Sequence, residues 1–355
     1  MEKSDAVWSE EGTTPDAIEA ALRGLLFERH AENEGFLPAR VLNMIAFVDR
    51  EWSGEIANRL RGVGRYHASR MLVFQFEPGR RRMDAHMSIA SEGDPALGEL
   101  ALLRETIVVD IGERHLDDLL TIADPLVVSD LPTLLWSPHG HPEVIDELLA
   151  LAQAVLLDSV DEPDAQEGIE RAYSLSERAY VVDLAWLRST PWRERVAASF
   201  DPPRLRPELR AIESLTIRHH PDSTVAAMLF VGWLASRLSW ETGPLEADGG
   251  ASLIGEARDA DRSAVALRLE AAPQLQVRGL EGLTLQTALG HELSLDRGPG
   301  GLHAKDRNAQ GEQREWTIPG ASRGETGILG EGIRQALLRD PTYVPALKAA
   351  EGLLA

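Results

Sequence analysis

Apolar positions along the chain switch repeatedly between helical and strand spacing, which predicts helices interspersed with strands. After the helix-start pair Thr14-Pro15, apolar residues recur every three to four positions from Ile18 to Leu26. Short runs rich in β-branched and aromatic residues follow. In the first half the predicted strands are Val41–Val48, Met71–Phe76, Met83–Ile89, Thr106–Asp110, Leu131–Trp136 and Ala154–Leu157, and the predicted helices are Glu51–Arg61, His115–Ile122 and Pro142–Leu151.

The second half repeats this alternation and then becomes strand-rich. The expected elements are a helix at Ile169–Ser176, a strand at Ile212–His219, an apolar helix at Asp222–Trp240, a meander of Ser252–Ala257, Ala264–Leu269, Gln274–Val277 and Thr284–Leu289, and two final helices at Thr326–Leu338 and Pro341–Leu353. Gly232 should let its helix pack closely against a neighbour. The pattern predicts an α/β fold with α+β elements in the C-terminal half.

A chain of 355 residues exceeds the usual size of a single core, so two domains are expected. Residues 159–168 (SVDEPDAQEG) are acidic and almost free of apolar side chains, as linkers often are. We therefore predict an N-terminal α/β domain over 1–158, a linker over 159–168, and a C-terminal α/β domain over 169–355. Each domain should be a mixed sheet with helices, and the C-terminal one should hold the meander and the two final helices. The similar element order of the halves fits either a duplication or two independent domains.

The net charge of −21 is concentrated in the middle of the chain. Between Ser91 and Asp183 there are 21 acidic residues, four arginines and no lysine, a local balance of −17. Such a stretch repels phosphate backbones, so nucleic acid is not an expected partner. It indicates either a solubilising surface or a surface that steers a basic patch of a protein partner.

Other features of composition bear on the compartment. The longest apolar run, Val225–Ala235, is shorter than the roughly 20 residues that a bilayer crossing needs, so no membrane association is expected. Met1–Gly12 is acidic and polar, without the basic and apolar regions of an export signal. The chain contains no cysteine, which excludes disulfides, thiolate metal sites and cysteine nucleophiles. A cytoplasmic protein is the simplest expectation.

The sequence offers little that resembles a catalytic or cofactor motif, and we predict no catalytic residue, no metal site and no cofactor. Gly62-Val63-Gly64 follows a predicted helix instead of a strand and lacks a third glycine, which favours a helix C-terminus over a dinucleotide turn. Two histidine pairs, His139/His141 and His219/His220, lack the i, i+4 spacing of a helical metal site, and the first pair has no clear third ligand. Three arginines at 80–82 form a basic cluster at a predicted hairpin tip, typical of exposed charge or of contact with an anion.

Tryptophan and arginine gather in two segments, Asp130–Trp136 (DLPTLLW) and Asp183–Asp201 (DLAWLRSTPWRERVAASFD). The candidate contact or contact-supporting residues there are Trp136, Trp186, Arg188, Trp192 and Arg193. They could be core aromatics with arginines bound to buried carbonyls. They could also hold a sugar phosphate, since arginine forks onto phosphate and an indole stacks on a sugar ring, or form the hot spot of a protein interface.

These two segments also carry a family resemblance. Together with Arg40–Ile45 (RVLNMI), His67–Arg70 (HASR), Leu156–Ser159 (LLDS) and Val231–Leu238 (VGWLASRL), they resemble the glucose-6-phosphate dehydrogenase assembly proteins of the OpcA type over about residues 40–240. Ala68 departs from the proline expected after the histidine. The resemblance implies a non-enzymatic partner of glucose-6-phosphate dehydrogenase, needed for its assembly or activation in the oxidative pentose phosphate pathway. The resemblance also implies a response to thiol redox state in some members of the family. A chain without cysteine cannot use that mechanism directly.

From this resemblance we expect a protein that binds the dehydrogenase and favours its active oligomer or conformation. The alternative is a sugar-phosphate-binding enzyme or sensor, such as a lactonase-like hydrolase, that uses the same tryptophans and arginines. A general scaffold without a metabolic ligand is a third possibility.

Overall fold

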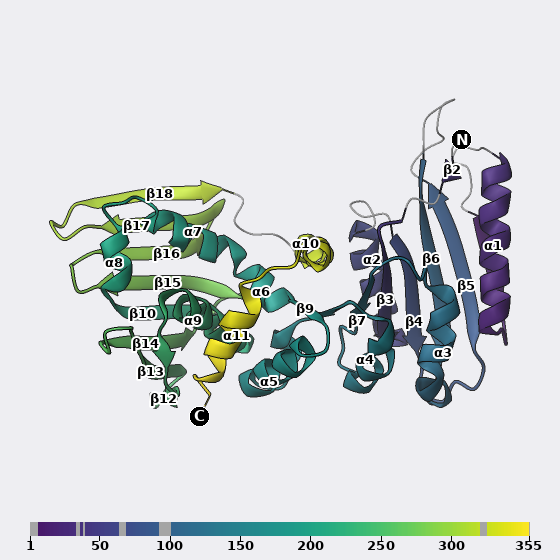
Figure 1. The fold of residues 1–355 in the computed structure, drawn as a ribbon, viewed down its shortest axis with the longest axis horizontal. Coiled ribbons are helices and arrows are strands. Elements are labelled where there is room, and N and C mark those ends of the chain that lie inside the picture. The colour runs from purple at the N-terminus through teal and green to yellow at the C-terminus, as the bar shows by residue number, and fades with distance from the viewer. Residues whose placement is uncertain are drawn as a thin grey trace. The chain divides into compact units, whose positions relative to one another are not determined.

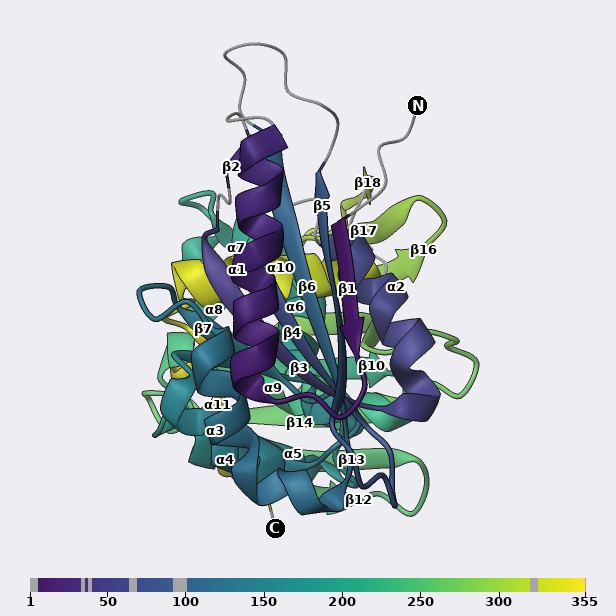
Figure 2. The ribbon, with the colours of Figure 1, turned by 90° about the vertical axis from the view of Figure 1, so that its right-hand side faces the viewer.

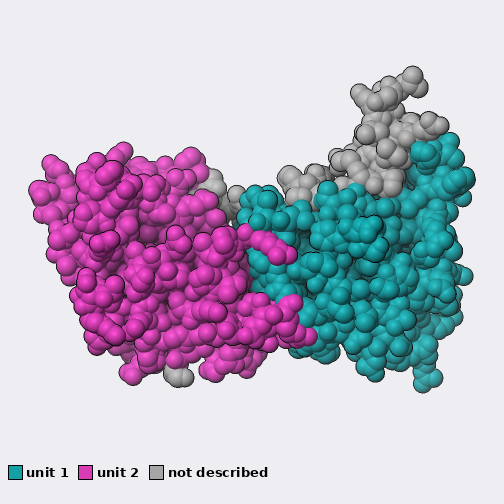
Figure 3. Space-filling model, in the orientation of Figure 1, with its two compact units in different colours: residues 1–157, 179–182, 325–338 teal, residues 158–178, 183–324, 339–355 magenta. Residues whose placement is uncertain are grey.

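The computed structural model of the protein describes residues 6–32, 36–37, 40–63, 69–91, 101–319 and 325–354. The chain divides into two compact units (Figure 3). Unit 1 comprises residues 1–157, 179–182 and 325–338, and unit 2 comprises residues 158–178, 183–324 and 339–355. The division after Leu157 lies one residue before the expected one, and residues 159–168 belong to unit 2 instead of a separate linker. The first of the two final helices belongs to unit 1.

Unit 1 is built on a sheet with strand order β1-β5-β6-β4-β3-β7-β8-β9, and β2 also pairs with β6. Its strands are β1 (Ala6–Glu10), β2 (Phe36–Leu37), β3 (Leu42–Asp49), β4 (Ser69–Phe76), β5 (Asp84–Ser91), β6 (Ala101–Ile111), β7 (Thr133–Trp136), β8 (Ala154–Leu157) and β9 (Tyr180–Asp183). Its helices are α1 (Pro15–Glu32), α2 (Ser53–Val63), α3 (Leu119–Ala123), α4 (Pro142–Leu148) and α10 (Glu325–Leu338), with short 3-10 turns at Arg50–Trp52, Glu113–Asp118, Asp124–Leu126 and Leu149–Leu151. β3, β4 and β7 have fully or largely buried side chains, as strands covered on both faces do.

The central strands of unit 1 have the order of a dinucleotide-binding domain. β6, β4, β3, β7 and β8 pair in parallel. With β9 last and the antiparallel β5 set aside, chain order across the sheet reads 3-2-1-4-5-6. Right-handed crossovers then place α2 on one face and α3 and α4 on the other, as Figure 2 shows. The order reverses between β3 and β7, and their carboxyl ends form the topological switch point.

Unit 2 has a mostly antiparallel sheet in the order β11-β13-β14-β10-β15-β16-β17-β18, with β12 beside β13 (Figure 1). Its strands are β10 (Ile212–His219), β11 (Glu241–Thr242), β12 (Glu246–Ala247), β13 (Ser252–Arg258), β14 (Ala264–Ala271), β15 (Leu280–Thr287), β16 (Glu292–Gly298), β17 (Gly301–Arg307) and β18 (Gln313–Pro319). β10 and β14 pair in parallel, and the other strand pairs described in this sheet are antiparallel. The helices are α5 (Ala165–Ser176), α6 (Leu184–Arg188), α7 (Thr190–Phe200), α8 (Arg206–Arg210), α9 (Thr224–Leu238) and α11 (Tyr343–Glu351), with 3-10 turns at Ser159–Asp161 and Pro221–Ser223.

The core of unit 2 is centred on α9, which is buried from Val225 to Gly232 and contacts β10, β14, α5 and α11. A Cβ at Gly232 would lie 2.1 Å from the backbone oxygen of Ala346 in α11. The close approach of these two helices therefore requires glycine, as the sequence predicted. Among the described residues no helix is long and apolar enough to cross a membrane.

The α/β fold class is confirmed, with two mixed sheets and helices. β1, β9 and α8 were not among the expected elements, and two further differences lie in the strand-rich part of unit 2. Gln274–Val277 is irregular, and β16 to β18 extend the sheet of unit 2 well beyond the expected meander. The central strands of unit 1 pair in parallel, whereas most strands of unit 2 pair antiparallel. The similar element order of the two halves therefore does not extend to how their strands pair. Gly64, His67 and Ala68 lie outside the described residues.

Candidate functional site

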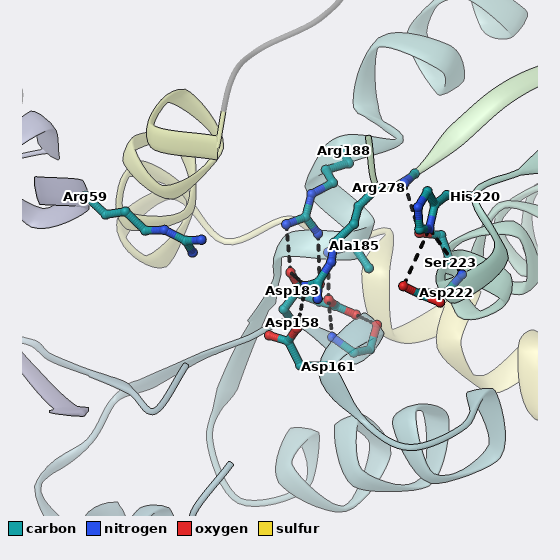
Figure 4. Close-up of polar contacts among 12 residues, drawn as sticks. Arg59, Asp158, Asp161, Asp183, Ala185, Arg188, His220, Asp222, Ser223 and Arg278 are labelled. Atoms are coloured by element: carbon teal, nitrogen blue, oxygen red, sulfur yellow. Dashed lines mark hydrogen bonds and ion pairs between the residues drawn. The ribbon is translucent and has the colours of Figure 1, made fainter. Parts of the chain in front are cut away.

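Asp158, the third residue of the segment LLDS, forms a buried ion pair in unit 2 (Figure 4). Asp158 directly follows β8, and Arg188 closes the short helix α6. The two guanidinium nitrogens of Arg188 donate to the two carboxylate oxygens of Asp158 over 2.8 and 2.7 Å. Both side chains are almost completely buried. This two-pronged geometry offsets the desolvation of both charges and leaves these donor and acceptor atoms facing each other instead of a ligand.

Asp183 is a second buried carboxylate beside this pair, and it caps α6. One of its oxygens accepts from the backbone N–H groups of Ala185 and Ser159, at 2.9 and 3.2 Å. The other accepts from the hydroxyls of Ser159 and Tyr343, at 2.8 and 3.0 Å. Burial raises the pKa of Asp183 to about 6, and the negative charge of Asp158 adds to the rise. Ser159 is itself buried, so this hydroxyl–carboxylate contact joins segments of the unit and is not open to a substrate.

The network reaches the surface through Arg278, which lies in the connection between β14 and β15. Its guanidinium pairs with Asp161 and lies 3.7 Å from Asp158. Burial raises the pKa of Asp161, and the nearby Asp158 carboxylate adds to this rise. Arg278 and Asp161 line a cavity of about 510 Å³ together with Asp222. We name Asp158, Asp161, Asp183, Arg188 and Arg278 the aspartate–arginine cluster.

A neighbouring arrangement in unit 2 holds Arg193 against Trp186. The guanidinium carbon of Arg193 lies 3.4 Å from the centre of the indole ring. Its nitrogens donate to the Ser189 hydroxyl, the Thr190 hydroxyl and the backbone oxygen of Trp186. The indole N–H donates to Asp340 over 2.8 Å. Burial lowers the pKa of Arg193 to about 10, which still leaves it protonated at neutral pH.

All five residues singled out from the sequence are buried. Each side chain is at most 8% exposed in Trp136, Trp186, Arg188, Trp192 and Arg193. Four of them lie in unit 2, whereas Trp136 ends β7 in the sheet of unit 1. None of them offers an exposed face to a partner in this structure, so any effect on binding must act through the surface they support. Their role in partner contact stays a prediction.

Sequence reasoning did not single out the polar residues that organise unit 1. Glu105, completely buried in β6, pairs with Arg40 and Arg70. Asn43 in β3 donates to the backbone oxygens of Val128 and Leu131 and accepts from the Val128 N–H. Arg40, Asn43 and Arg70 belong to the segments that carry the family resemblance. Asn43 and Arg70 stand out as polar residues within apolar strands, and Arg40 lies two residues before one. They fix loops against the sheet.

The switch point of unit 1 is where a dinucleotide would bind in this fold, but its residues do not fit one. A cofactor cradle needs a glycine-rich turn between the first strand and its helix, so that backbone N–H groups approach the pyrophosphate. Here β3 ends at Asp49 and runs through Arg50, Glu51 and Trp52 before α2 begins. This turn thus carries the carboxylates of Asp49 and Glu51, which repel an anionic pyrophosphate, and bulky side chains instead of the glycines.

The histidines at this switch point are engaged with acidic and aromatic side chains. His141, in left-handed backbone geometry with φ of 59°, has its ring nitrogens 3.0 Å from Asp49 and 3.2 Å from Glu143. His139 lies next to Trp52, with ring centres 5.7 Å apart. Among the described residues no three His, Asp or Glu side chains are placed to hold a metal ion.

These features define a class: a two-unit α/β protein whose first unit has a dinucleotide-binding strand order without the matching cofactor turn. Comparison with known families then specifies it. Residues 61–174 match the glucose-6-phosphate dehydrogenase subunit N-terminal domain, and residues 179–347 match the corresponding C-terminal domain. The chain belongs to this OpcA family of glucose-6-phosphate dehydrogenase assembly proteins.

Individual relatives agree with the family. The chain is 33% identical over 120 residues to the OxPP cycle protein OpcA of Nostoc punctiforme, covering 33% of this chain and 26% of that protein. It is 27% identical over 150 residues to the protein of the same name from Synechococcus elongatus, covering 41% and 34%. The matches thus span about a quarter to a third of these relatives. Among solved structures, D-galactose-1-dehydrogenase from Rhizobium etli aligns with a TM-score of 0.46 and 13% identity, over 89% of this chain and 95% of that one.

Proposed function

We propose that the protein is a non-enzymatic assembly partner of glucose-6-phosphate dehydrogenase that binds the enzyme and favours its active oligomer or conformation. The observation that carries this proposal is the match of both parts of the chain to domains described as a subunit of that dehydrogenase. The poor fit of the switch point to a dinucleotide supports it, because a dehydrogenase of this fold would need that cofactor.

Activation requires a difference in affinity between two states of the dehydrogenase. A partner that bound the active and inactive states equally would shift nothing, however tightly it bound. Each factor of ten in favour of the active state corresponds to about 1.4 kcal/mol. The oxidative pentose phosphate pathway and the cytoplasm are the setting that this role implies.

The buried tryptophans and arginines take part in this proposal as supporting residues. Trp186, Arg188, Trp192 and Arg193 hold the surface of unit 2, and Trp136 holds the sheet of unit 1. Arg278 is the arginine of the aspartate–arginine cluster that is substantially exposed, so Arg278→Ala tests the supported surface without opening the core. Arg204→Ala, an exposed arginine on the same unit, is the matched control.

The test is the activity of glucose-6-phosphate dehydrogenase from the same organism, titrated with this protein while light scattering reports the mass of the mixture. We expect a saturable rise in activity together with a complex of defined mass. Absence of both would refute the proposal. The sugar-phosphate alternative would instead show as thermal stabilisation of the chain alone by glucose 6-phosphate, about 2.7 kcal/mol at 100 times the dissociation constant.

A further inference from the structure

The switch point of unit 1 presents an accessible tryptophan. Trp52 ends the 3-10 turn that joins β3 to α2, and 46% of its surface is exposed. By contrast, Trp136, Trp186, Trp192 and Trp240 are buried. A half-exposed tryptophan loses hydration favourably when a partner covers it, and tryptophan is enriched at binding hot spots.

The side chains around Trp52 are arranged to hold it in place. Its ring lies against that of His139. His141, two residues further, is held by Asp49 and Glu143 and packs edge-on against Phe47. The turn therefore rests on β3 and on the residues that lead into α4. An aromatic group supported in this way needs little ordering when a partner binds, which favours affinity.

The charges at this position select the kind of partner. Glu51 is exposed beside Trp52, and Glu143 is also largely exposed. The nearby Arg50 is paired with Asp110 and Glu77, so its positive charge is balanced within unit 1. An exposed indole next to the Glu51 carboxylate, with Glu143 held on the neighbouring His141, favours a lysine or arginine side chain, through cation–π contact and ion pairing, and disfavours phosphate.

We propose that the switch-point surface of unit 1, formed by Trp52, Glu51, His139 and Glu143, binds a basic, lysine- or arginine-bearing segment of the dehydrogenase instead of a dinucleotide. The inference rests on the proposed function, because the dehydrogenase is the partner it names. It adds a location in a fold whose switch point ordinarily holds a cofactor, and it assigns recognition of NADP within the complex to the enzyme alone.

The experiment compares Trp52→Ala with wild type in binding to the intact dehydrogenase by titration calorimetry. Phe27→Ala is the matched control, because Phe27 is an exposed aromatic side chain of α1 in the same unit, 75% exposed. Loss of a hot-spot tryptophan should raise the dissociation constant at least about tenfold, whereas Phe27→Ala should leave it within about twofold. Glu51→Lys should also weaken binding, and added salt should weaken the wild-type complex.

The outcomes separate the two proposals. If the wild-type protein binds the dehydrogenase and Trp52→Ala binds it as tightly as Phe27→Ala does, this inference is overturned and the proposed function is left intact. No wild-type complex at all would overturn both. A parallel titration of the isolated chain with NADP⁺ should show no saturable binding. Binding of NADP⁺ that is lost in Trp52→Ala would show that the switch point retains a cofactor site. Unchanged far-ultraviolet circular dichroism confirms that each variant is folded.

Discussion

Aromatic and charged side chains meet in two regions of this protein, with opposite consequences. In unit 2, Trp186 and Arg193 are buried, and their polar atoms are satisfied by Asp340 and by nearby hydroxyls and carbonyls. In unit 1, Trp52 lies beside His139 and a carboxylate with nearly half of its surface open. The same residue types thus stabilise a core in one place and remain available to a partner in the other. Burial, more than residue type, decides which role a tryptophan has.

Truncating a tryptophan in each region should have the most unequal effects on stability. Trp186→Ala removes a buried indole and its hydrogen bond to Asp340, and should lower the free energy of unfolding by about 3–5 kcal/mol. Trp52→Ala removes a half-exposed ring and should cost less than about 1 kcal/mol. Urea unfolding of the two variants measures the difference. Equal losses would mean that Trp52 is as structural as Trp186.

Arg188→Ala tests whether the aspartate–arginine cluster is structural. The change leaves the Asp158 carboxylate buried without its two-pronged partner, and removing one member of such a pair costs about 3–5 kcal/mol. Arg204→Ala, at an exposed position, should change stability by less than about 0.5 kcal/mol in the same unfolding assay. If Arg188→Ala unfolds like the control and loses activation of the dehydrogenase, Arg188 serves the partner-binding surface and not the stability of the fold.

Asp183 should make stability depend on pH. Its folded pKa of about 6 lies above its ordinary value of 3.8, so the folded state binds more protons between these pH values. The stability it contributes is present below about pH 4 and is lost as pH rises through about 6, by about 3 kcal/mol. Asp183→Asn removes this titration while keeping the shape.

The measurement is unfolding by urea at pH 4.5 and at pH 7.5. Relative to wild type, Asp183→Asn should gain stability between the two values. Asp222→Asn, at a largely exposed carboxylate, should show no such gain. A wild-type stability that rises over this range together with an unchanged difference to Asp183→Asn would argue that Asp183 is ionised at both values.

Much of the fold could be predicted because apolar periodicity reports local structure directly. β8 and β10 begin and end at the predicted residues, Ala154–Leu157 and Ile212–His219. β16 to β18 were missed because only one face of them is buried, so each contains few apolar residues between polar ones. Four of the 3-10 turns fall at the ends of predicted helices, because apolar spacing does not distinguish a short 3-10 turn from an α-helix. The strand order of unit 1 arises from pairing between distant segments, which periodicity does not encode.

The sequence predicted which residues gather at the site, but not whether their side chains are buried or exposed. Trp186 and Arg193 were noticed because they cluster along the chain, and the same clustering places them together in the core. Trp52 is isolated in sequence, and its proximity to His139 depends on the parallel pairing of β3 with β7. The partners of Arg188 and Arg193, namely Asp158 and Asp340, lie 30 and about 150 positions away, beyond the reach of any local motif.

The smallest predicted effect uses the same substitution with opposite sign in the two units. Gly232→Ala places a methyl group 2.1 Å from the Ala346 oxygen, so α9 and α11 must separate, at a cost of about 1–3 kcal/mol. Gly24→Ala in α1 meets no atom within 4 Å and should stabilise the protein by about 0.5–1 kcal/mol, because alanine favours helix. Thermal unfolding of the two variants decides between them. If both are stabilised, the approach of α9 to α11 does not depend on Gly232, and the core of unit 2 is less tightly packed than its contacts indicate.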